Sequence, residues 1–89
     1  MRQSVTVVIQ NRLGLHARPA MAFVDTAKGF DAAVRVSRED ISVDGKSIME
    51  MMMLAATQGT ELLIECDGDD AEDCCGKLKA LVDARFDEE

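Results

Sequence analysis

The sequence has no tryptophan or tyrosine and only one proline and one histidine, and aromatic residues make up 3% of its 89 residues. A hydrophobic core must therefore be built from aliphatic side chains, methionine and the phenylalanines Phe23, Phe30 and Phe86. The hydrophobic fraction of 47% and the charged fraction of 30% are typical of a folded globular protein and exclude a disordered chain. The length fits a single small domain over residues 1–89.

Positive charge is also scarce. Ten lysines and arginines stand against 17 aspartates and glutamates, which gives a formal net charge of −7. Nucleic-acid phosphates are neutralised by clustered lysine and arginine, so the composition argues against nucleic acid as a partner. No apolar run approaches the length that spans a membrane, and the first residues lead straight into a strand pattern. We therefore expect no membrane segment, no signal peptide and a cytoplasmic location.

Cysteine is limited to Cys66, Cys74 and Cys75. The count is odd, the adjacent pair is unsuited to a disulfide bond, and no Cys-x-x-Cys spacing is present for zinc. We predict reduced thiols, no metal site and no cofactor. Cys74 and Cys75 fit best as small buried side chains on a helix.

Hydrophobic periodicity predicts four strands and three helices. The predicted strands cover residues 5–9, 32–37, 41–43 and 61–66. The predicted helices cover residues 17–28 and 47–56 and an apolar stripe over residues 71–86, with an N-cap supplied by residues 67–70. The order strand, helix, strand, strand, helix, strand, helix indicates an α+β fold of two layers, with the helices on one face of a largely antiparallel sheet.

The single histidine and the single proline lie together where the first helix is predicted to begin. Pro19 suits the first turn of a helix, which places His16 at or just before its N-terminus. Free backbone N–H groups and the helix dipole favour an anion there, and Arg18 adds a planar donor group suited to phosphate. Imidazole is a nucleophile that forms covalent intermediates. These residues predict a phosphohistidine site, and the alternative is a histidine that only caps the helix.

The second predicted helix has more apolar surface than one packed face needs. Met51, Leu54 and Ala55 are expected on the stripe that faces the core. The apolar residues in excess of that face are Ile48, Met49, Met52 and Met53. Flexible methionines on a surface indicate a protein-interaction site, and the alternative is a core rich in methionine.

Ser47 and Glu50 have the spacing of a capping box, in which the serine caps the helix and the glutamate bonds back to the serine N–H. The Ser47 hydroxyl is also a candidate for phosphorylation, because a helix N-terminus stabilises the added negative charge. The residues alone do not choose between a cap and a switch.

Taken together, the two segments resemble the HPr family, the histidine-containing phosphocarrier proteins of the bacterial phosphoenolpyruvate-dependent phosphotransferase system. The resemblance rests on Gly14-Leu15-His16-Ala17-Arg18-Pro19-Ala20 and on Gly45-Lys46-Ser47-Ile48-Met49-Glu50-Met51-Met52. Residues 11–16 and the chain end at residues 86–89 look most like the nitrogen-related NPr branch. The resemblance implies an open-faced β-sandwich with three helices over a four-stranded antiparallel sheet, in the order βαββαβα.

The same resemblance implies roles for individual residues. His16 would accept a phosphoryl group on Nδ1 from enzyme I and donate it to a IIA-type protein, and Arg18 matches the active-site arginine. Ser47 matches the serine that HPr kinase/phosphorylase modifies in many bacteria. The residues expected to contact partners are Ala17, Ala20, Met21, Ile48, Met49 and Met52. A monomeric carrier without turnover of its own is implied, serving sugar uptake or nitrogen regulation.

Asp25 and Glu50 stand where many family members have other residues, and they make the expected docking surface more acidic. An alternative function is a regulatory binding module that acts through Ser47 and the methionines, with a vestigial His16. The presence of both His16 and Arg18 favours the carrier. A metal site that combines His16 with the thiols is disfavoured, because the thiols lie at the far end of the chain.

Overall fold

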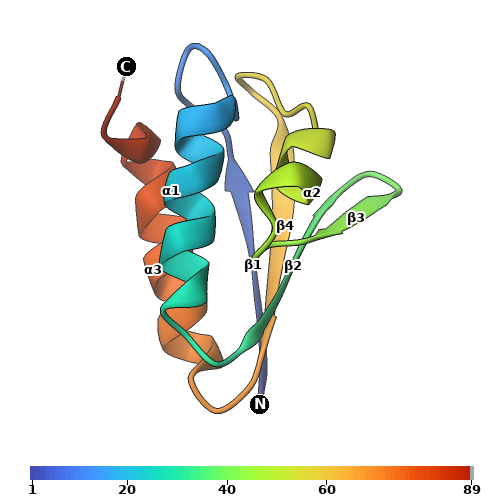
Figure 1. The fold of residues 1–89 in the computed structure, drawn as a ribbon, viewed down its shortest axis with the longest axis vertical. Helices are drawn as coiled ribbons and strands as arrows, with labels where there is room; N and C mark the ends of the chain where they lie inside the picture. The colour runs from blue at the N-terminus through green and yellow to red at the C-terminus, as the bar shows by residue number, and fades with distance from the viewer. Residues whose placement is uncertain (89) are drawn as a thin grey trace.

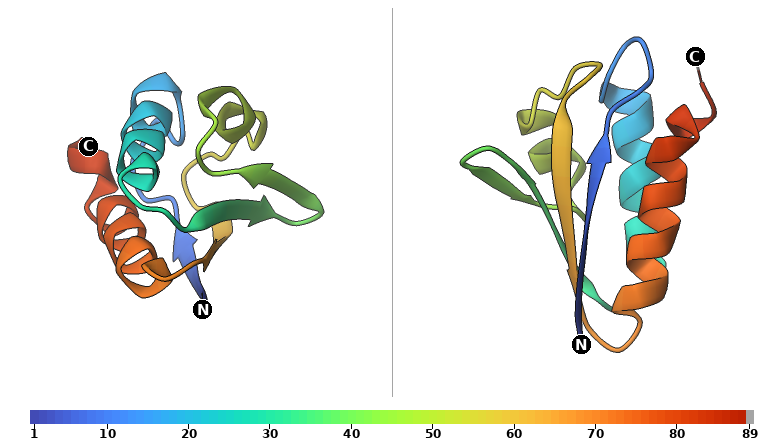
Figure 2. Two further views of the ribbon diagram at one scale, coloured as in Figure 1. Left: turned by 60° about the horizontal axis from the view of Figure 1, so that its bottom comes forward. Right: turned by 180° about the vertical axis from the view of Figure 1, so that it is seen from behind.

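In the computed structural model, which describes residues 1–88, a four-stranded antiparallel sheet carries three helices on one face (Figure 1). The elements are β1 (Arg2–Val8), α1 (Ala17–Lys28), β2 (Ala33–Arg38), β3 (Ile41–Asp44), α2 (Ile48–Met53), β4 (Glu61–Asp67), α3 (Ala71–Asp83) and the short turn η1 (Arg85–Asp87). The strand order is β1-β4-β2-β3, and α1 and α3 lie side by side over the sheet (Figure 2). The predicted α+β fold and its element order are confirmed. No helix within residues 1–88 has the length and apolar character that crossing a membrane requires.

Successive side chains of a strand point to opposite faces of the sheet, so every second residue faces the helices. Val7 on β1 pairs with Leu62 on β4, and both side chains are buried together with Ile64. The apolar stripes of α1 and α3 cover this face, and Phe23 of α1 is the largest fully buried side chain. Removing these apolar groups from water is the main force that holds the two layers together. The core is mostly aliphatic, as the shortage of aromatic residues predicts.

α2 is shorter than predicted, because it ends at Met53 and does not continue to Ala56. Arg38, the last residue of β2, donates from Nη1 to the carbonyl oxygens of Leu54 and Ala55, at 2.7 and 3.1 Å. A guanidinium group there satisfies carbonyls that a helix end leaves free, and it matches the negative end of the helix dipole. Ala55 then adopts a left-handed φ of 49°, which turns the chain away from the helix axis.

The predicted capping box at the start of α2 is correct for the serine and wrong for the glutamate. Ser47 is the N-cap, and its Oγ accepts a hydrogen bond from the Glu50 N–H at 3.2 Å. The Glu50 carboxylate does not bond to the Ser47 N–H, which donates to the carbonyl of Asp44 at 3.1 Å. Instead, Glu50 Oε1 accepts from the backbone N–H of Asp44 at 3.0 Å and ties the helix to the end of β3.

The last helix begins where predicted, with Asp70 as its N-cap by position, and ends earlier than predicted. The Asp70 carboxylate accepts from the N–H groups of Asp31 and Ala32, each at 2.9 Å, and not from its own helix. These hydrogen bonds lower the pKa of Asp70 below its ordinary value of 3.8, and the bond from Asp31 has the larger effect. α3 ends at Asp83, so Phe86 is buried from the separate turn η1 and not from the helical stripe.

The thiols pack in the core, as predicted for Cys74 and Cys75. Cys66 on β4 and Cys75 on α3 hold their sulfur atoms 3.3 Å apart, which is a hydrogen-bond distance and far longer than a disulfide bond. Burial raises the pKa of the Cys66 thiol, so the sulfur stays protonated. The thiols therefore act as small apolar side chains between the sheet and α3.

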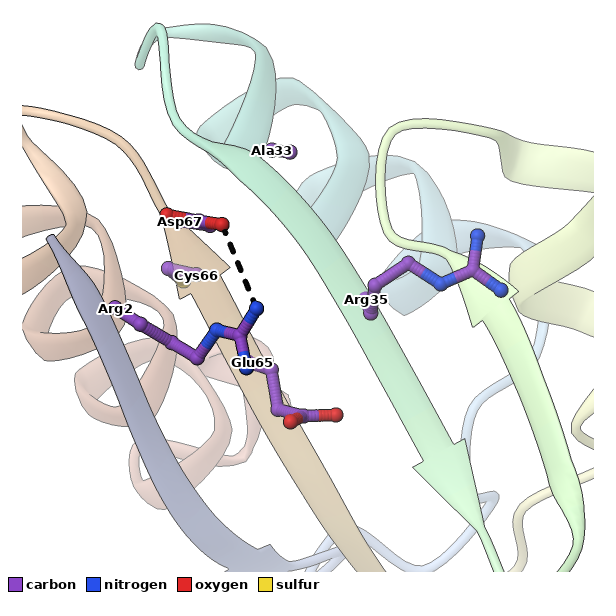
Figure 3. A pocket seen from close by; sticks show the side chains of 6 residues that line it. All are labelled: Arg2, Ala33, Arg35, Glu65, Cys66 and Asp67. Atoms are coloured by element: carbon purple, nitrogen blue, oxygen red, sulfur yellow. Dashed lines mark ion pairs between the residues drawn. The ribbon is translucent and has the colours of Figure 1, made fainter.

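The face of the sheet opposite the helices carries charges of both signs on neighbouring strands (Figure 3). Arg2 pairs with Asp67 at 3.8 Å, and Arg35 lies across from Glu65 in the sheet register. These side chains line a hollow of about 240 Å³. The Arg2–Asp67 pair is exposed, and exposed pairs contribute little to stability. We assign no function to this face.

The methionines of α2 allow a test of which side of the helix is packed. Met51 is fully buried, whereas Met53 is 66% exposed. Met51→Ala should lower the free energy of unfolding by about 2–4 kcal/mol, because it removes buried apolar area and leaves a cavity. Met53→Ala should change it by less than about 0.5 kcal/mol. Denaturant unfolding curves measure both, and equal losses would contradict the observed packing of α2.

Candidate functional site

His16 occupies the N-cap position of α1, with an extended backbone at φ −81° and ψ −171°. Its carbonyl accepts the first helical hydrogen bond, from the Ala20 N–H at 3.0 Å. The side chain makes no capping hydrogen bond, so the alternative of a histidine that only caps the helix is wrong. The imidazole is 38% exposed, and Pro19 lies in the first turn as predicted.

The loop before His16 is held against the segment that follows α2. The Leu15 N–H donates to the Ala56 carbonyl at 2.8 Å. Gly14 has a φ of 71°, and a Cβ on this residue would lie 2.5 Å from the Ala56 carbonyl oxygen. Glycine is therefore required here both by the left-handed backbone and by the close approach of the two segments.

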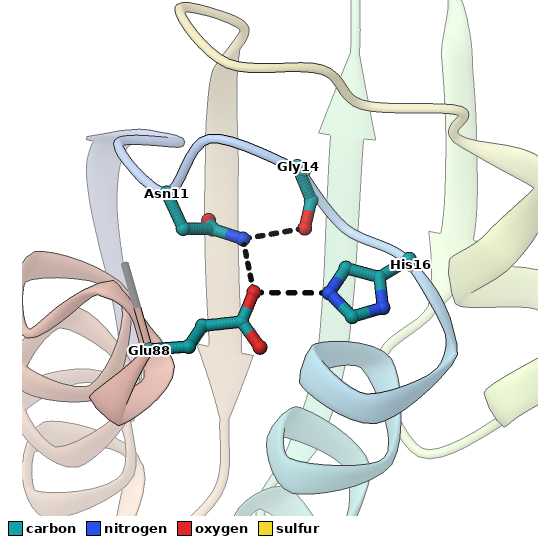
Figure 4. Close-up of polar contacts among 4 residues, drawn as sticks. All are labelled: Asn11, Gly14, His16 and Glu88. Atoms are coloured by element: carbon teal, nitrogen blue, oxygen red, sulfur yellow. Dashed lines mark hydrogen bonds and ion pairs between the residues drawn. The ribbon is translucent and has the colours of Figure 1, made fainter.

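Two further residues complete the surroundings of the imidazole: Asn11, shortly before it in the sequence, and Glu88, near the end of the described chain (Figure 4). Glu88 places Oε1 2.9 Å from Nε2 of His16. The same oxygen accepts a hydrogen bond from Nδ2 of Asn11 at 2.9 Å, and Nδ2 also donates to the Gly14 carbonyl at 2.6 Å. Asn11 is fully buried. The loop, the start of α1 and the end of the described chain are thus joined by one chain of hydrogen bonds.

The Glu88 carboxyl is held in its ionised form. The hydrogen bond with His16 lowers its pKa below the ordinary value of 4.5, and partial burial opposes this effect. The hydrogen bond from Asn11 and the positive charge of Arg18 lower the pKa further. Since an ionised carboxylate only accepts hydrogen bonds, Nε2 of His16 must carry the shared proton.

The first turn of α1 adds hydrogen-bond donors beside the ring. The Ala17 and Arg18 N–H groups precede the first helical donor, so they have no acceptor within the helix, and Pro19 has no N–H. They lie at the positive end of the helix dipole. The Arg18 side chain is exposed, and its charge acts on Glu88. This arrangement suits an oxyanion such as a phosphoryl group.

The predicted docking residues lie on α1 and α2, which pack against each other (Figure 1). On α1, Ala17 is exposed and Met21 is 50% exposed. Ala20 is fully buried, so the prediction that it contacts a partner is wrong: it lies on the face of α1 that packs into the core.

The methionine patch on α2 is exposed, which favours the interaction site over a methionine-rich core. Its members are Ile48, Met49, Met52 and Met53, with exposed fractions from 37% to 82%. Met51 and Leu54 are fully buried, as predicted, whereas the prediction for Ala55 is wrong: it is exposed at the left-handed turn that follows the helix. Ser47 is half-buried at the start of the same helix.

The thiols and His16 are not brought together. The thiols lie between β4 and α3, whereas His16 lies at the N-terminus of α1. In the part of the chain that the structure describes, no group of three or more His, Cys, Asp or Glu side chains is arranged to hold a metal ion.

Comparisons with known proteins decide the family. Residues 3–84 match the family model described as PTS HPr component phosphorylation site. The phosphocarrier protein HPr of Pseudomonas aeruginosa is 45% identical, with 96% of each chain covered, and the phosphocarrier protein NPr of Proteus mirabilis is 37% identical, with 100% of each covered. The crystal structure of HPr-C-His from Thermoanaerobacter tengcongensis matches with a TM-score of 0.94 at 40% identity, covering 98% of each chain.

The chain belongs to the HPr family. It is a phosphocarrier protein of the bacterial phosphotransferase system. The resemblance carried by the two motifs is confirmed, and relatives named HPr and NPr both match over nearly all of their length. Of these two relatives, the one named HPr shares the higher identity.

Asn11 and Glu88 are the two residues of this HPr-family site that sequence reasoning missed. Asn11 has the sequence context of a strand end, and Glu88 belongs to an acidic tail. The one available signal is Phe86, because an apolar residue in a polar tail indicates that the tail packs back onto the protein. That signal does not identify the residue against which the tail packs.

Gly14 can be tested as the residue that sets the position of His16. Gly14→Ala should lower stability by about 1–3 kcal/mol, because it forces a Cβ into a left-handed backbone and against the Ala56 carbonyl. It should also shift the His16 ring resonances. Gly76→Ala is the matched control, since a Cβ there meets nothing within 4 Å, and it should be neutral or stabilising. Thermal unfolding and NMR spectra provide the measurements, and a Gly14→Ala variant as stable as wild type would contradict the close approach.

Proposed function

We propose that His16 is the phosphoryl carrier of this chain, taking a phosphoryl group on Nδ1 from enzyme I and passing it to a IIA-type protein. The observation that carries the proposal is the orientation of the imidazole. Nε2 is engaged by Glu88, so Nδ1 is the ring nitrogen left free within residues 1–88. The ring is 38% exposed, so two different proteins can reach it in turn. Membership of the family supports the identity of donor and acceptor.

The proposed chemistry balances at each atom. The Nδ1 lone pair forms a bond to phosphorus while the bond between phosphorus and the donor breaks, and its electron pair leaves with the donor. Nε2 keeps its proton, so the ring becomes a cation. The phosphoryl oxygens then accept hydrogen bonds from the Ala17 and Arg18 N–H groups and from the Arg18 guanidinium group. Transfer to the acceptor is the same step in reverse, with the acceptor atom replacing Nδ1.

We also propose a carrier without turnover of its own, acting as a monomeric domain in the cytoplasm, as expected for the family. The hollow of about 240 Å³ lies on the open face of the sheet, and another of about 530 Å³ lies between Phe30 and α3. His16 lines neither of these two hollows. A surface histidine of this kind suits transfer between proteins.

We further propose that partners dock on Met21 and the methionine patch. An exposed apolar surface of flexible side chains suits several partners of different shape. The Leu15–Ala56 hydrogen bond connects the His16 loop to the segment directly after α2, which supports a common contact surface. Asp25 is exposed, whereas Glu50 is partly buried and engaged by the Asp44 N–H. The acidic contribution to docking therefore comes chiefly from Asp25.

Ser47 is proposed as a regulatory phosphorylation site, modified by a kinase of the HPr kinase/phosphorylase type. Its position before the exposed Ile48 and Met49 supports this role. A phosphate at Ser47 would lie beside the docking surface, where covering it requires removal of water from a dianion. Phosphorylation would then weaken docking through charge without refolding the domain.

The carrier role predicts distinct effects for two substitutions. With phosphoenolpyruvate and enzyme I, His16→Ala should lose all acid-labile phosphate and keep its fold. Arg18→Ala should still be labelled, but about tenfold to hundredfold more slowly, because a charge-assisted contact to the transferring group is lost. Rapid-quench labelling and circular dichroism measure rate and fold. Acid-labile label retained on His16→Ala would exclude His16 as the carrier, and an unlabelled wild type would favour the regulatory binding module.

The regulatory role predicts different outcomes for two substitutions at Ser47. Ser47→Asp should raise the apparent Michaelis constant for enzyme I-dependent phosphorylation of His16, because it adds charge beside the docking surface. Ser47→Ala should transfer normally but lose about 1 kcal/mol of stability with the helix cap. Steady-state phosphorylation and denaturant unfolding test both. An aspartate variant as efficient as wild type would leave Ser47 as a cap alone.

A further inference from the structure

We propose that Glu88 is a positioning residue of the carrier site: its carboxylate holds the proton on Nε2 of His16 and so presents the Nδ1 lone pair to the phosphoryl donor. The inference rests on the proposed function of His16 and adds to it a residue that lies outside both motifs. Three observations support it: the hydrogen bond that Glu88 makes with His16, the one that it makes with Asn11, and the left-handed backbone of residues 85–87 that places Glu88 beside the ring.

The first support is the direction in which the hydrogen bonds run. Neutral imidazole carries one proton, on either nitrogen, and the partner of one nitrogen decides the state of the other. Oε1 of Glu88, 2.9 Å from Nε2, is an acceptor and has no proton to give. The contact is therefore made only when Nε2 carries the proton. Nδ1 then keeps its lone pair, which is what a nucleophile requires.

The second support is that Glu88 is itself held in place. Oε1 also accepts from Nδ2 of Asn11 at 2.9 Å. Asn11 is fully buried, and its second Nδ2 proton goes to the Gly14 carbonyl at 2.6 Å. The amide cannot be reversed, because its oxygen would then face two acceptors. Asn11 thus holds the same carboxylate oxygen that faces the ring (Figure 4).

The third support is the unusual backbone that precedes Glu88. Arg85, Phe86 and Asp87 have φ values of 57°, 54° and 60°, a left-handed conformation that is unfavourable for residues with a Cβ. Phe86 is 8% exposed and anchors the turn in the core. The turn bends the chain after α3 toward the N-terminal end of α1 (Figure 1). Backbone strain of this kind persists where the surrounding structure requires it.

The carboxylate also acts during transfer through the ring. When Nδ1 bonds to phosphorus, the imidazole becomes a cation, and the negative charge of Glu88 lies at the opposite nitrogen. It stabilises the developing positive charge without approaching the incoming phosphoryl group. The exposed fractions of the two side chains, 38% for His16 and 23% for Glu88, reduce the effect by solvent screening. We expect loss of this charge to slow phosphoryl acceptance by about tenfold.

The tautomer of His16 is the most direct test. Two-bond ¹H–¹⁵N NMR spectra of the unphosphorylated full chain, recorded with the ring in its neutral form, report which nitrogen carries the proton. Wild type should show the proton on Nε2 alone. Glu88→Ala should give ring nitrogen shifts averaged between the two tautomers and faster exchange of the Nε2 proton with water. Asp87→Asn is the matched control, because it removes a neighbouring exposed charge from the same turn, and it should match wild type.

The kinetic test separates hydrogen bonding from charge and avoids partner docking. Phosphoramidate is a small phosphoryl donor that reacts with imidazole directly, without enzyme I. Glu88→Gln keeps an oxygen that can accept from Nε2 and loses the charge, so it should keep the tautomer yet accept phosphate about tenfold more slowly. Asp87→Asn should react at the wild-type rate.

Four results would overturn the proposal: a proton on Nδ1 in wild type, unchanged ring shifts in Glu88→Ala, an unchanged phosphoramidate rate in Glu88→Gln, or phosphorylation of Nε2. The proposed function fails separately, if enzyme I places no phosphate on His16 of the wild type. The tautomer experiment is independent of that result, because it uses no phosphoryl donor.

Discussion

The site depends on a single backbone contact, the hydrogen bond from the Leu15 N–H to the Ala56 carbonyl. It fixes the loop that delivers His16 and hence the point at which α1 begins. The other side of the same segment is held by Arg38, whose guanidinium group binds the carbonyls of Leu54 and Ala55. The histidine loop and the end of α2 are therefore attached to one short stretch of backbone. A change in that stretch would move the nucleophile and the methionine patch together.

The patch itself shows how a small acidic chain can keep an apolar surface exposed. Met51 and Leu54 anchor α2 in the core, while Met49 and Met53 are 82% and 66% exposed. The formal net charge of −7 opposes association of the chain with its own copies. Flexible methionines can repack against different surfaces, which suits a carrier that must meet a donor and an acceptor in turn.

The surroundings of His16 depart from local structural preferences in two places. Asn11 is fully buried, and within residues 1–88 its Oδ1 has no hydrogen-bond partner, although both Nδ2 protons are used. The turn at Arg85, Phe86 and Asp87 is left-handed without a glycine. Such departures gather where function requires them, and the buried Phe86 side chain offsets part of their cost. Both departures concern the position of Glu88. Asn11 donates a hydrogen bond to its carboxylate, the turn directly precedes it, and the carboxylate contacts the imidazole.

The sequence by itself determined the order of the elements, the position of His16 at a helix start, the N-cap role of Ser47 and the burial of Cys74 and Cys75. These features depend on local spacing, on hydrophobic periodicity and on the rarity of histidine and proline, all of which can be seen in a short window of sequence.

Only the tertiary structure decided which polar groups meet. The Glu50 carboxylate has the Ser47 N–H as a possible local partner, but it accepts from the Asp44 N–H instead. The Asp70 carboxylate likewise accepts from the N–H groups of Asp31 and Ala32, before β2, and not from its own helix. The contact between His16 and Glu88 joins residues 72 positions apart. A side-chain acceptor has many possible donors, and packing of the sheet and helices selects among them. The nucleophile could therefore be found in the sequence, whereas the group that orients it could not.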